Sequence, residues 1–208
     1  MIELLQEMKV RLTFFEEVLG TSSNNPEIHD EFIASKAKDA PSREEEVEAL
    51  GVGEVVEKSM TVFPRMIIDG NSVPFVWDYQ VKGFFKDTCG ALRRASGSLS
   101  SKVTAFKKEI DGGIFVKERK IPFNNYGQVG ECQRPLRGQT AQGERIALAH
   151  SETVQAGSYV DLTIQWLPSK KYDWREIITE WLDYGQLRGF GQWRNSGKGR
   201  FTWELIED

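Results

Sequence analysis

The sequence predicts an α+β fold in which an antiparallel sheet carries its helices on one face. Apolar segments of strand character stand near both ends of the chain, and amphipathic helical segments lie between them. Glycine, proline and asparagine mark the turns that separate these segments. The order of strands and helices is typical of a two-layer arrangement. With 208 residues, 39% of them hydrophobic, the chain suits one domain, 1–208, with an acidic insertion at 20–58.

The first part of the chain predicts strands on either side of an acidic helix. Residues 8–15 alternate in polarity and predict a strand, whereas the Gly, Ser, Asn and Pro residues at 20–27 predict a loop. A helix is expected to begin at Ser42, because Glu45 completes a capping box three residues later. The extended stretches that follow are 59–69 and 73–77, with a turn at 70–71.

The middle of the chain predicts two helices that pass into a strand. The helices are expected at 78–95 and 100–110, and the glycine pair at 112–113 is expected to end the second of them. A strand is expected at 114–123. Residues 124–143 are rich in Gly, Gln, Asn and Arg and predict either a long loop or an irregular hairpin.

The last part of the chain predicts three strands and one helix. Two strands are expected at 145–154 and 158–167, around a turn at 155–157. Residues 173–185 predict a helix, and the last strand is expected at 200–207. The helix has apolar residues at i, i+3, i+4, i+7 and i+8, namely Trp174, Ile177, Ile178, Trp181 and Leu182.

The charge of the chain is unevenly distributed. The net charge is −4, but residues 27–57 contain ten acidic and three basic residues and account for −7. The rest of the chain is therefore mildly basic. The stretch 82–120 alone holds ten basic and four acidic residues. The acidic segment predicts a solvated helix or, alternatively, a surface that mimics nucleic acid or docks on a basic partner.

Composition excludes several classes of protein. No apolar run approaches the ~18 residues of a membrane span, and the N-terminus lacks the order of a signal peptide, so we expect a cytoplasmic location and no membrane partner. The two cysteines, Cys89 and Cys132, are expected to be buried thiols. Two cysteines and two histidines lie too far apart for paired zinc ligands, so no metal and no cofactor are expected.

Residues 185–201, GQLRGFGQWRNSGKGRF, form a glycine-rich segment with five glycines and four cations. Glycine allows close approach of a ligand to the main chain, and free N–H groups in such a turn bind anions. Trp193 and Phe190 are candidates for stacking on bases. The alternative is that these glycines only allow the chain to pass from helix to strand. The segment follows a helix and fits neither a GxxxxGK[ST] phosphate loop nor a dinucleotide fingerprint, so nucleotide hydrolysis is not expected.

Residues 67–94 resemble a segment of the RAMP (repeat-associated mysterious protein) superfamily of CRISPR effector complexes, and resemble most the backbone subunits that line up along the guide RNA. The matching residues are Pro74, Phe75, Val76, Val81, Lys82 and Gly83, with the basic helix residues Lys86, Arg93 and Arg94. The family's second hallmark, a glycine-rich loop before the last strand, is similar to Gly189, Gly191, Gly197 and Gly199. The resemblance implies a ferredoxin-like (RRM-like) antiparallel sheet with helices on one face and inserted loops.

One part of the resemblance fails. Where the family has Pro-Gly-Ser-Ser, this chain has Trp77-Asp78-Tyr79-Gln80. The change removes the small residues that let an RNA backbone lie close, and Asp78 repels a phosphate unless it caps the helix. The resemblance covers about half of the chain, at its two ends and in its middle.

The resemblance and the cations together predict a protein that holds single-stranded RNA without cleaving it, along the sheet and against the glycine-rich segment. The residues expected to bind RNA are Lys82, Lys86, Arg93, Arg94, Arg188, Gly189, Gly191, Trp193, Arg194, Gly197, Lys198, Gly199 and Arg200. A looser basic region consists of Lys102, Lys107, Lys108, Lys117, Arg119 and Lys120.

Two alternatives remain open at the level of sequence. An endoribonuclease of the same fold would use His29 or Asp30, since some relatives carry a cleaving aspartate or a general acid–base histidine in that region. An interaction protein, from phage or host, would join or block a CRISPR effector complex through the acidic segment. The partners expected across these alternatives are RNA, other effector subunits and further copies of the chain.

Overall fold

The computed structural model describes residues 4–23, 60–140 and 143–207, and the side chains of these ranges except at 135–140, 143–148 and 207. The helix expected to begin at Ser42, the candidate catalytic residues His29 and Asp30, and most of the expected insertion at 20–58 lie outside the described residues.

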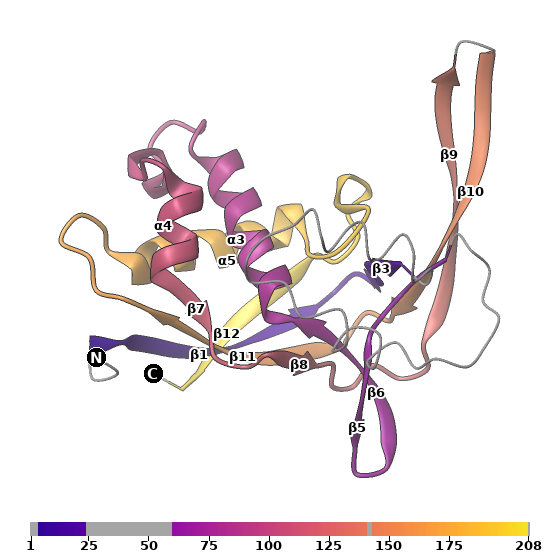
Figure 1. Ribbon diagram of the computed structural model, residues 1–208, viewed down its shortest axis with the longest axis horizontal. Helices are drawn as coiled ribbons and strands as arrows, with labels where there is room; N and C mark the ends of the chain where they lie inside the picture. The colour runs from indigo at the N-terminus through magenta and orange to yellow at the C-terminus, as the bar shows by residue number, and fades with distance from the viewer. Residues whose placement is uncertain (1–3, 24–59, 141–142, 208) are drawn as a thin grey trace.

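A four-stranded antiparallel sheet forms the centre of the fold (Figure 1). Its strands, in spatial order, are β12 (Phe201–Glu207), β1 (Gln6–Phe14), β11 (Tyr159–Trp166) and β7 (Ile114–Val116). The helix α3 (Asp78–Leu92) lies between β1 and β7 in the chain, and α5 (Trp174–Arg188) lies between β11 and β12. In chain order the four strands therefore make a βαββαβ unit with the last strand beside the first. The fold is ferredoxin-like, as the sequence predicted.

The helices cover one face of this sheet (Figure 1). Alternate residues of β1 point into that face, and Met8, Val10, Leu12 and Phe14 are buried. The helix α5 faces these residues, and all five residues of its predicted apolar stripe are buried. A third, shorter helix, α4 (Phe106–Gly113), packs on α3. The core is thus one apolar layer between sheet and helices.

The connections between these elements carry further strands. One sheet contains β2 (Val18–Leu19), β3 (Ser22–Ser23), β4 (Met60–Val62), β9 (Gly130–Thr140) and β10 (Gly143–Val154). Another contains β5 (Arg65–Ile68), β6 (Asn71–Trp77) and β8 (Lys120–Pro122). Figure 1 shows the β9–β10 hairpin projecting on one side of the body and the β5–β6 hairpin on another.

Several boundaries differ from the sequence predictions for local reasons. The strand expected at 59–69 is split into β4 and β5 because Pro64 has no N–H to donate, and the neighbouring Phe63 N–H donates to the Glu152 carboxylate instead. The turn of the β5–β6 hairpin falls at Asp69-Gly70, one residue earlier than expected, where φ values of 49° and 79° fit a type I′ turn.

The middle of the chain is more broken than its pattern suggested. The helix expected at 100–110 is a 3₁₀ turn, η2 (Leu99–Lys102), followed by α4, because Ala105 adopts a left-handed φ of 48° between them. The strand expected at 114–123 is divided between two sheets as β7 and β8. In place of a long loop, 130–140 pairs with β10, so that β10 partners β9 rather than β11.

Among the described residues, none of the helices combines the length and the apolar character needed to cross a membrane.

Gly185 is required where α5 crosses β12. A Cβ at this position would lie 2.2 Å from the Phe201 ring, which is itself fully buried. We expect Gly185→Ala to lower the free energy of unfolding by about 1–3 kcal/mol through overpacking. Gly83→Ala is the matched control, because a Cβ in that part of α3 meets nothing within 4 Å. This variant should be about 0.5–1 kcal/mol more stable than wild type in urea denaturation. Equal effects of the two substitutions would contradict the packing of α5 on β12.

Candidate nucleic-acid interface

Phe190 anchors the glycine-rich segment to the core. The segment leaves α5 at Gly189, and the next side chain, Phe190, is only 4% exposed. Its ring centroid lies 6.4 Å from that of Phe14 on β1 and 6.2 Å from that of Phe84 on α3. The expectation that Phe190 stacks on bases is therefore wrong, because apolar burial holds the ring inside the protein.

Several glycines of the segment serve its own packing. The Phe190 N–H donates to the Gly199 carbonyl at 2.8 Å, which brings the two limbs of the segment together. A Cβ on Gly199 would lie 1.9 Å from the Phe190 carbonyl oxygen, and one on Gly189 would lie 2.3 Å from that of Lys198. Gly191 approaches the Leu19 carbonyl oxygen in the same way, whereas Gly197 is near only the Arg200 side chain. For Gly189, Gly191 and Gly199 the close neighbour is the protein's own backbone.

The four cations of the segment are paired with carboxylates. Arg188 Nε and Arg194 Nη1 donate to the same Asp87 oxygen on α3, at 3.0 and 2.8 Å. The hydrogen bond from Arg188 to Asp87 raises the pKa of this guanidinium further above its ordinary value. Lys198 pairs with Glu17, and Arg200 Nη2 donates to Glu16 at 2.8 Å. The segment therefore presents little net positive charge, although partly exposed pairs of this kind exchange partners at small cost.

Trp193 remains at the surface of the segment. Its side chain is 38% exposed and its φ of 53° is left-handed. The guanidinium of Arg134, on β9, lies 5.3 Å from the centroid of the Trp193 ring. Sequence reasoning missed Arg134, because it placed this residue in a loop or irregular hairpin and gave no sign that this part of β9 contacts Gln192 of the glycine-rich segment.

Two of the lysines predicted on α3 turn toward α4. Lys82 is only 7% exposed, and its ammonium donates to the Asp111 carbonyl oxygen at 3.3 Å. Lys86 forms an ion pair with the Asp111 carboxylate. The face that residues 82, 86 and 93 share is thus largely an interface between two helices.

The exposed cations gather where α3 passes into α4. This α3–α4 turn, residues 93–108, contains five basic and no acidic residues, namely Arg93, Arg94, Lys102, Lys107 and Lys108. All five are exposed, and the Arg93 guanidinium also lies over the Phe106 ring at 5.2 Å. The structure shows no carboxylate partner for any of them among the described residues. The α3–α4 turn is therefore a positive surface made of exposed cations.

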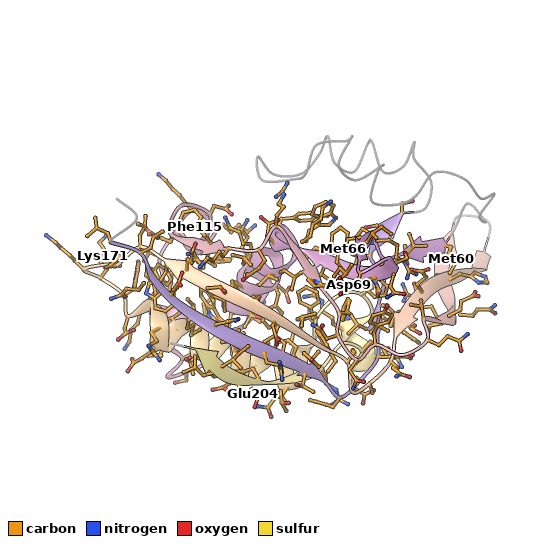
Figure 2. The ribbon with its side chains drawn as sticks, turned by 90° about the horizontal axis from the view of Figure 1, so that it is seen from below. Met60, Met66, Asp69, Phe115, Lys171 and Glu204 are labelled. Carbon is orange, nitrogen blue, oxygen red and sulfur yellow. The ribbon has the colours of Figure 1, made fainter. Side chains whose placement is uncertain are left out.

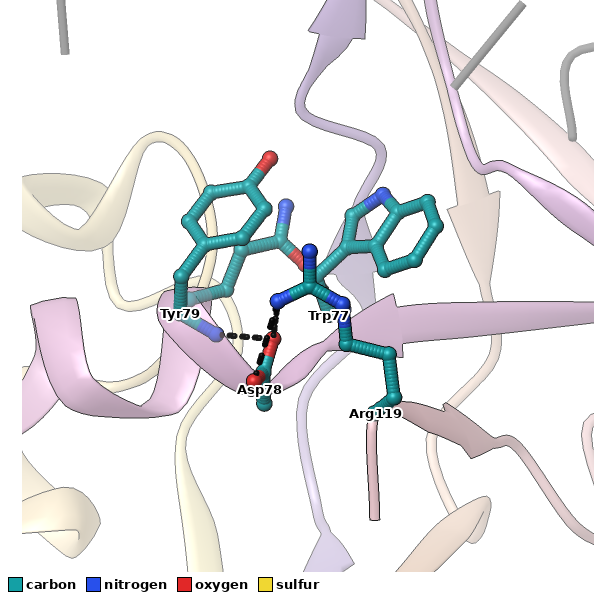
Figure 3. Close-up of polar contacts among 5 residues, drawn as sticks. Trp77, Asp78, Tyr79 and Arg119 are labelled. Atoms are coloured by element: carbon teal, nitrogen blue, oxygen red, sulfur yellow. Dashed lines mark hydrogen bonds and ion pairs between the residues drawn. The ribbon is translucent and has the colours of Figure 1, made fainter. Parts of the chain in front are cut away.

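The residues that depart from the family pattern fill the start of α3 (Figure 3). The N-cap is Trp77, whose N–H donates to the Gln80 side chain, so Asp78 is the first residue of the helix and not its cap. Asp78 instead accepts from the Tyr79 N–H at 2.8 Å and from Arg119 Nη1 at 2.9 Å. Arg119 therefore neutralises the carboxylate that the sequence predicted would repel phosphate.

The open face of the sheet, seen in Figure 2, carries a balanced set of charges. Arg11 binds the Asp161 carboxylate with two hydrogen bonds, at 2.7 and 2.8 Å, and lies 4.1 Å from the Tyr159 ring centroid. Glu118 accepts from the Thr163 backbone and hydroxyl. Alternate strand residues place Glu7, Lys9, Arg11, Asp161 and Glu204 here, and the chain just after β7 adds Lys117 and Glu118, so the face has four carboxylates and three cations. This face offers no excess of positive charge to phosphates.

Among the described residues, no group of three His, Cys, Asp or Glu side chains is arranged to hold a metal ion.

His150 Nδ1 lies 2.7 Å from Glu131 across the β9–β10 hairpin, and this hydrogen bond lowers the pKa of Glu131. Both described cysteines are free; Cys89 is buried as expected, and burial raises the pKa of its thiol, whereas Cys132 is only half-buried.

The fold is similar to that of a protein in a CRISPR complex. A chain of the type III-B Cmr-beta bound to cognate target RNA superimposes with a TM-score of 0.50 over 99% of this chain, at 10% sequence identity. This chain covers 60% of that protein. A chain of a type IV-B CRISPR complex has a TM-score of 0.46 at 12% identity, over 97% of this chain and 90% of that one, which is too low to support an argument. Neither protein-family models nor curated proteins give a match to the sequence.

Asp87 holds the glycine-rich segment against α3 through two arginines. We expect Asp87→Asn to lower the free energy of unfolding by about 1 kcal/mol, because two partly exposed ion pairs are lost and two guanidinium groups then face each other. Asp69→Asn changes the charge equally in the exposed β5–β6 turn, where Asn is well tolerated, and should leave stability unchanged. Urea denaturation of the two variants tests this; equal stability of both would show that Asp87 does not hold the segment.

Proposed function

We propose that this chain is a RAMP-like RNA-binding subunit of a CRISPR-type complex, which holds single-stranded RNA through its sugar–phosphate backbone and does not cleave it. The observation that carries the proposal is the similarity of the whole chain in fold to a protein from a complex bound to target RNA. The glycine-rich segment, which resembles that of the RAMP superfamily in sequence, occupies the expected position between α5 and β12.

The distribution of charge supports the helix-covered side as the RNA path. The α3–α4 turn supplies unpaired cations, while the open face of the sheet is balanced by its own carboxylates. Asp87, which holds Arg188 and Arg194, lies in the last two turns of α3, and Arg94 follows seven residues later, just beyond the end of that helix. The path we propose therefore joins the glycine-rich segment to the α3–α4 turn across α3, and replaces the path along the sheet that the sequence suggested.

The chemistry of these groups supports binding with little base preference. Lysine and arginine contact phosphate oxygens, which are the same in every nucleotide, and Trp193 can stack on any base. The proposed contacts are Arg93, Arg94, Lys102, Lys107, Lys108, Arg188, Trp193, Arg194, Lys198 and Arg200. Lys82 and Lys86 support α4 in this proposal rather than binding RNA.

The first test is to purify the full chain, read the ratio of absorbance at 260 and 280 nm, and sequence any extracted nucleic acid. Co-purifying RNA, or binding of a labelled single-stranded RNA at low salt, is the expected result. Absence of both would overturn the proposal, and capture of CRISPR effector subunits by the RNA-free protein would then favour the interaction protein. Cleavage of the RNA, lost in His29→Ala or Asp30→Ala, would favour the endoribonuclease.

Arg94 lies on the proposed path, and its replacement should weaken binding without changing base preference. We expect the plot of log K against log salt for Arg94→Gln to be shallower by about 0.7, the contribution of one phosphate contact on a single strand. Lys117→Gln is the matched control, because Lys117 pairs with Glu7 near the open face of the sheet. Fluorescence anisotropy over a salt series measures both. A larger effect of Lys117→Gln would place the RNA on the sheet instead.

Asp87→Asn should act on RNA in the opposite direction to Arg94→Gln. The substitution releases Arg188 and Arg194 from their shared carboxylate, so both become available to phosphates. We expect tighter binding at low salt and a slope steeper by about 0.7 for each further phosphate that the released arginines bind. Weaker binding by this variant, measured under conditions in which it is fully folded, would contradict a role for the glycine-rich segment in holding RNA.

A further inference from the structure

Arg134 is a buried cation without a carboxylate. It lies on β9 opposite Ala149, where the β9–β10 hairpin meets the glycine-rich segment, and it is only 8% exposed. Every cation of the glycine-rich segment has an acidic partner, whereas no ion pair to Arg134 is present among the described residues. A guanidinium offers five N–H donors and no acceptor, so a buried arginine needs acceptors around it.

Most of the hydrogen-bonding capacity of Arg134 is unused. Nη2 donates to Gln192 Oε1 at 2.8 Å. Nε and Nη1 are both buried and have no acceptor among the residues that the structure describes. These two nitrogens carry one and two hydrogens. Buried charged donors that lack acceptors destabilise a protein, which makes such a group informative when it occurs.

The Trp193 ring lies against the guanidinium and is itself partly exposed to solvent. The Arg134 guanidinium lies 5.3 Å from the ring centroid, yet the Trp193 side chain is 38% exposed. The residue adopts a left-handed φ of 53°, which is unfavourable for a bulky side chain and is found mainly where the surrounding structure imposes it. Gly191, with a φ of 82°, lies two residues before it, so the indole is carried by a tight turn rather than by a helix or strand.

The two groups together select the chemistry of a ligand. The unused N–H groups require an anion, and phosphate oxygens accept from guanidinium groups in the fork geometry that arginine offers. The exposed indole offers a flat apolar face that suits a base. The carboxylates of an acidic peptide would satisfy the arginine, but an Asp or Glu residue does not itself carry an aromatic ring for the indole. A nucleotide has both parts.

We propose that Arg134 and Trp193 form one nucleotide-binding position, in which the phosphate binds the free N–H groups of Arg134 and the base stacks on Trp193. This inference rests on the proposed function and adds to it a defined point on the RNA path. The indole lies against the guanidinium. We therefore expect the indole to move aside when the phosphate binds Arg134, and the fluorescence of Trp193 to change as a result.

The test compares Arg134→Gln, Trp193→Ala and the double variant with Lys117→Gln as control for charge. Binding of a labelled single-stranded RNA should weaken about tenfold in each single variant, since one stacked base contributes roughly 1–3 kcal/mol. The double variant should lose little more than the single ones, because both residues hold one nucleotide. Lys117→Gln should bind as wild type does.

Two further measurements separate a binding role from a structural one. Arg134→Gln should be at least as stable as wild type in urea, because it removes a buried charge with unmet donors; a structural role would require a loss of stability. RNA should change the tryptophan fluorescence of the wild type, and this change should be absent in Trp193→Phe. Because the chain has six tryptophans, the signal of Trp193 has to be obtained by subtracting the spectrum of Trp193→Phe from that of the wild type.

The outcomes distinguish this inference from the proposed function. If the wild type binds RNA and the Arg134 and Trp193 variants bind equally well, the nucleotide position is wrong and the proposed function stands. If the wild type binds no RNA, the proposed function fails. If polyglutamate binds as tightly as RNA and its binding depends on Arg134, the partner of this position is an acidic protein, which overturns the nucleotide assignment.

Discussion

The insertion of Phe190 into the aromatic core is the contact on which the candidate site depends. Its ring packs against Phe14 of the sheet and Phe84 of α3, so it joins the two layers of the fold at the point where the glycine-rich segment begins. The close backbone contact between Phe190 and Gly199 then folds the segment back on itself. With its first and last residues fixed in this way, the segment presents Trp193 at a defined place beside Arg134.

Electrostatics divides the molecule into distinct surfaces. Carboxylates from α3 and from the chain just after β1 pair with the cations of the glycine-rich segment, and those of the open sheet face pair with the cations of that face. The α3–α4 turn has no such partners among the described residues. A polyanion that reaches the helix-covered side therefore meets exposed cations just beyond the C-terminal end of α3, and about two turns earlier on α3 it meets the arginines whose pairing with Asp87 it can exchange for phosphate.

The elements that could be predicted from the sequence are those whose buried residues recur with the period of a strand or a helix. The five apolar positions of α5 and the alternation of β1 follow from burial against each other, and both are where the sequence placed them. The sequence did not reveal β9, because residues 130–140 show no regular alternation of apolar and polar side chains. It also could not show that Phe190 is buried or that Lys82 lies under α4, since both depend on contacts between distant segments.

The central claim is that RNA lies on the helix-covered side, against the glycine-rich segment and the α3–α4 turn. The most direct test is to crosslink a bound single-stranded RNA with ultraviolet light and to identify the crosslinked peptides by mass spectrometry. The account predicts crosslinks in peptides that contain residues 93–108 and 188–200, with Trp193 among the modified residues. Crosslinks confined to β1 and β11 would place RNA on the open face of the sheet and contradict the account.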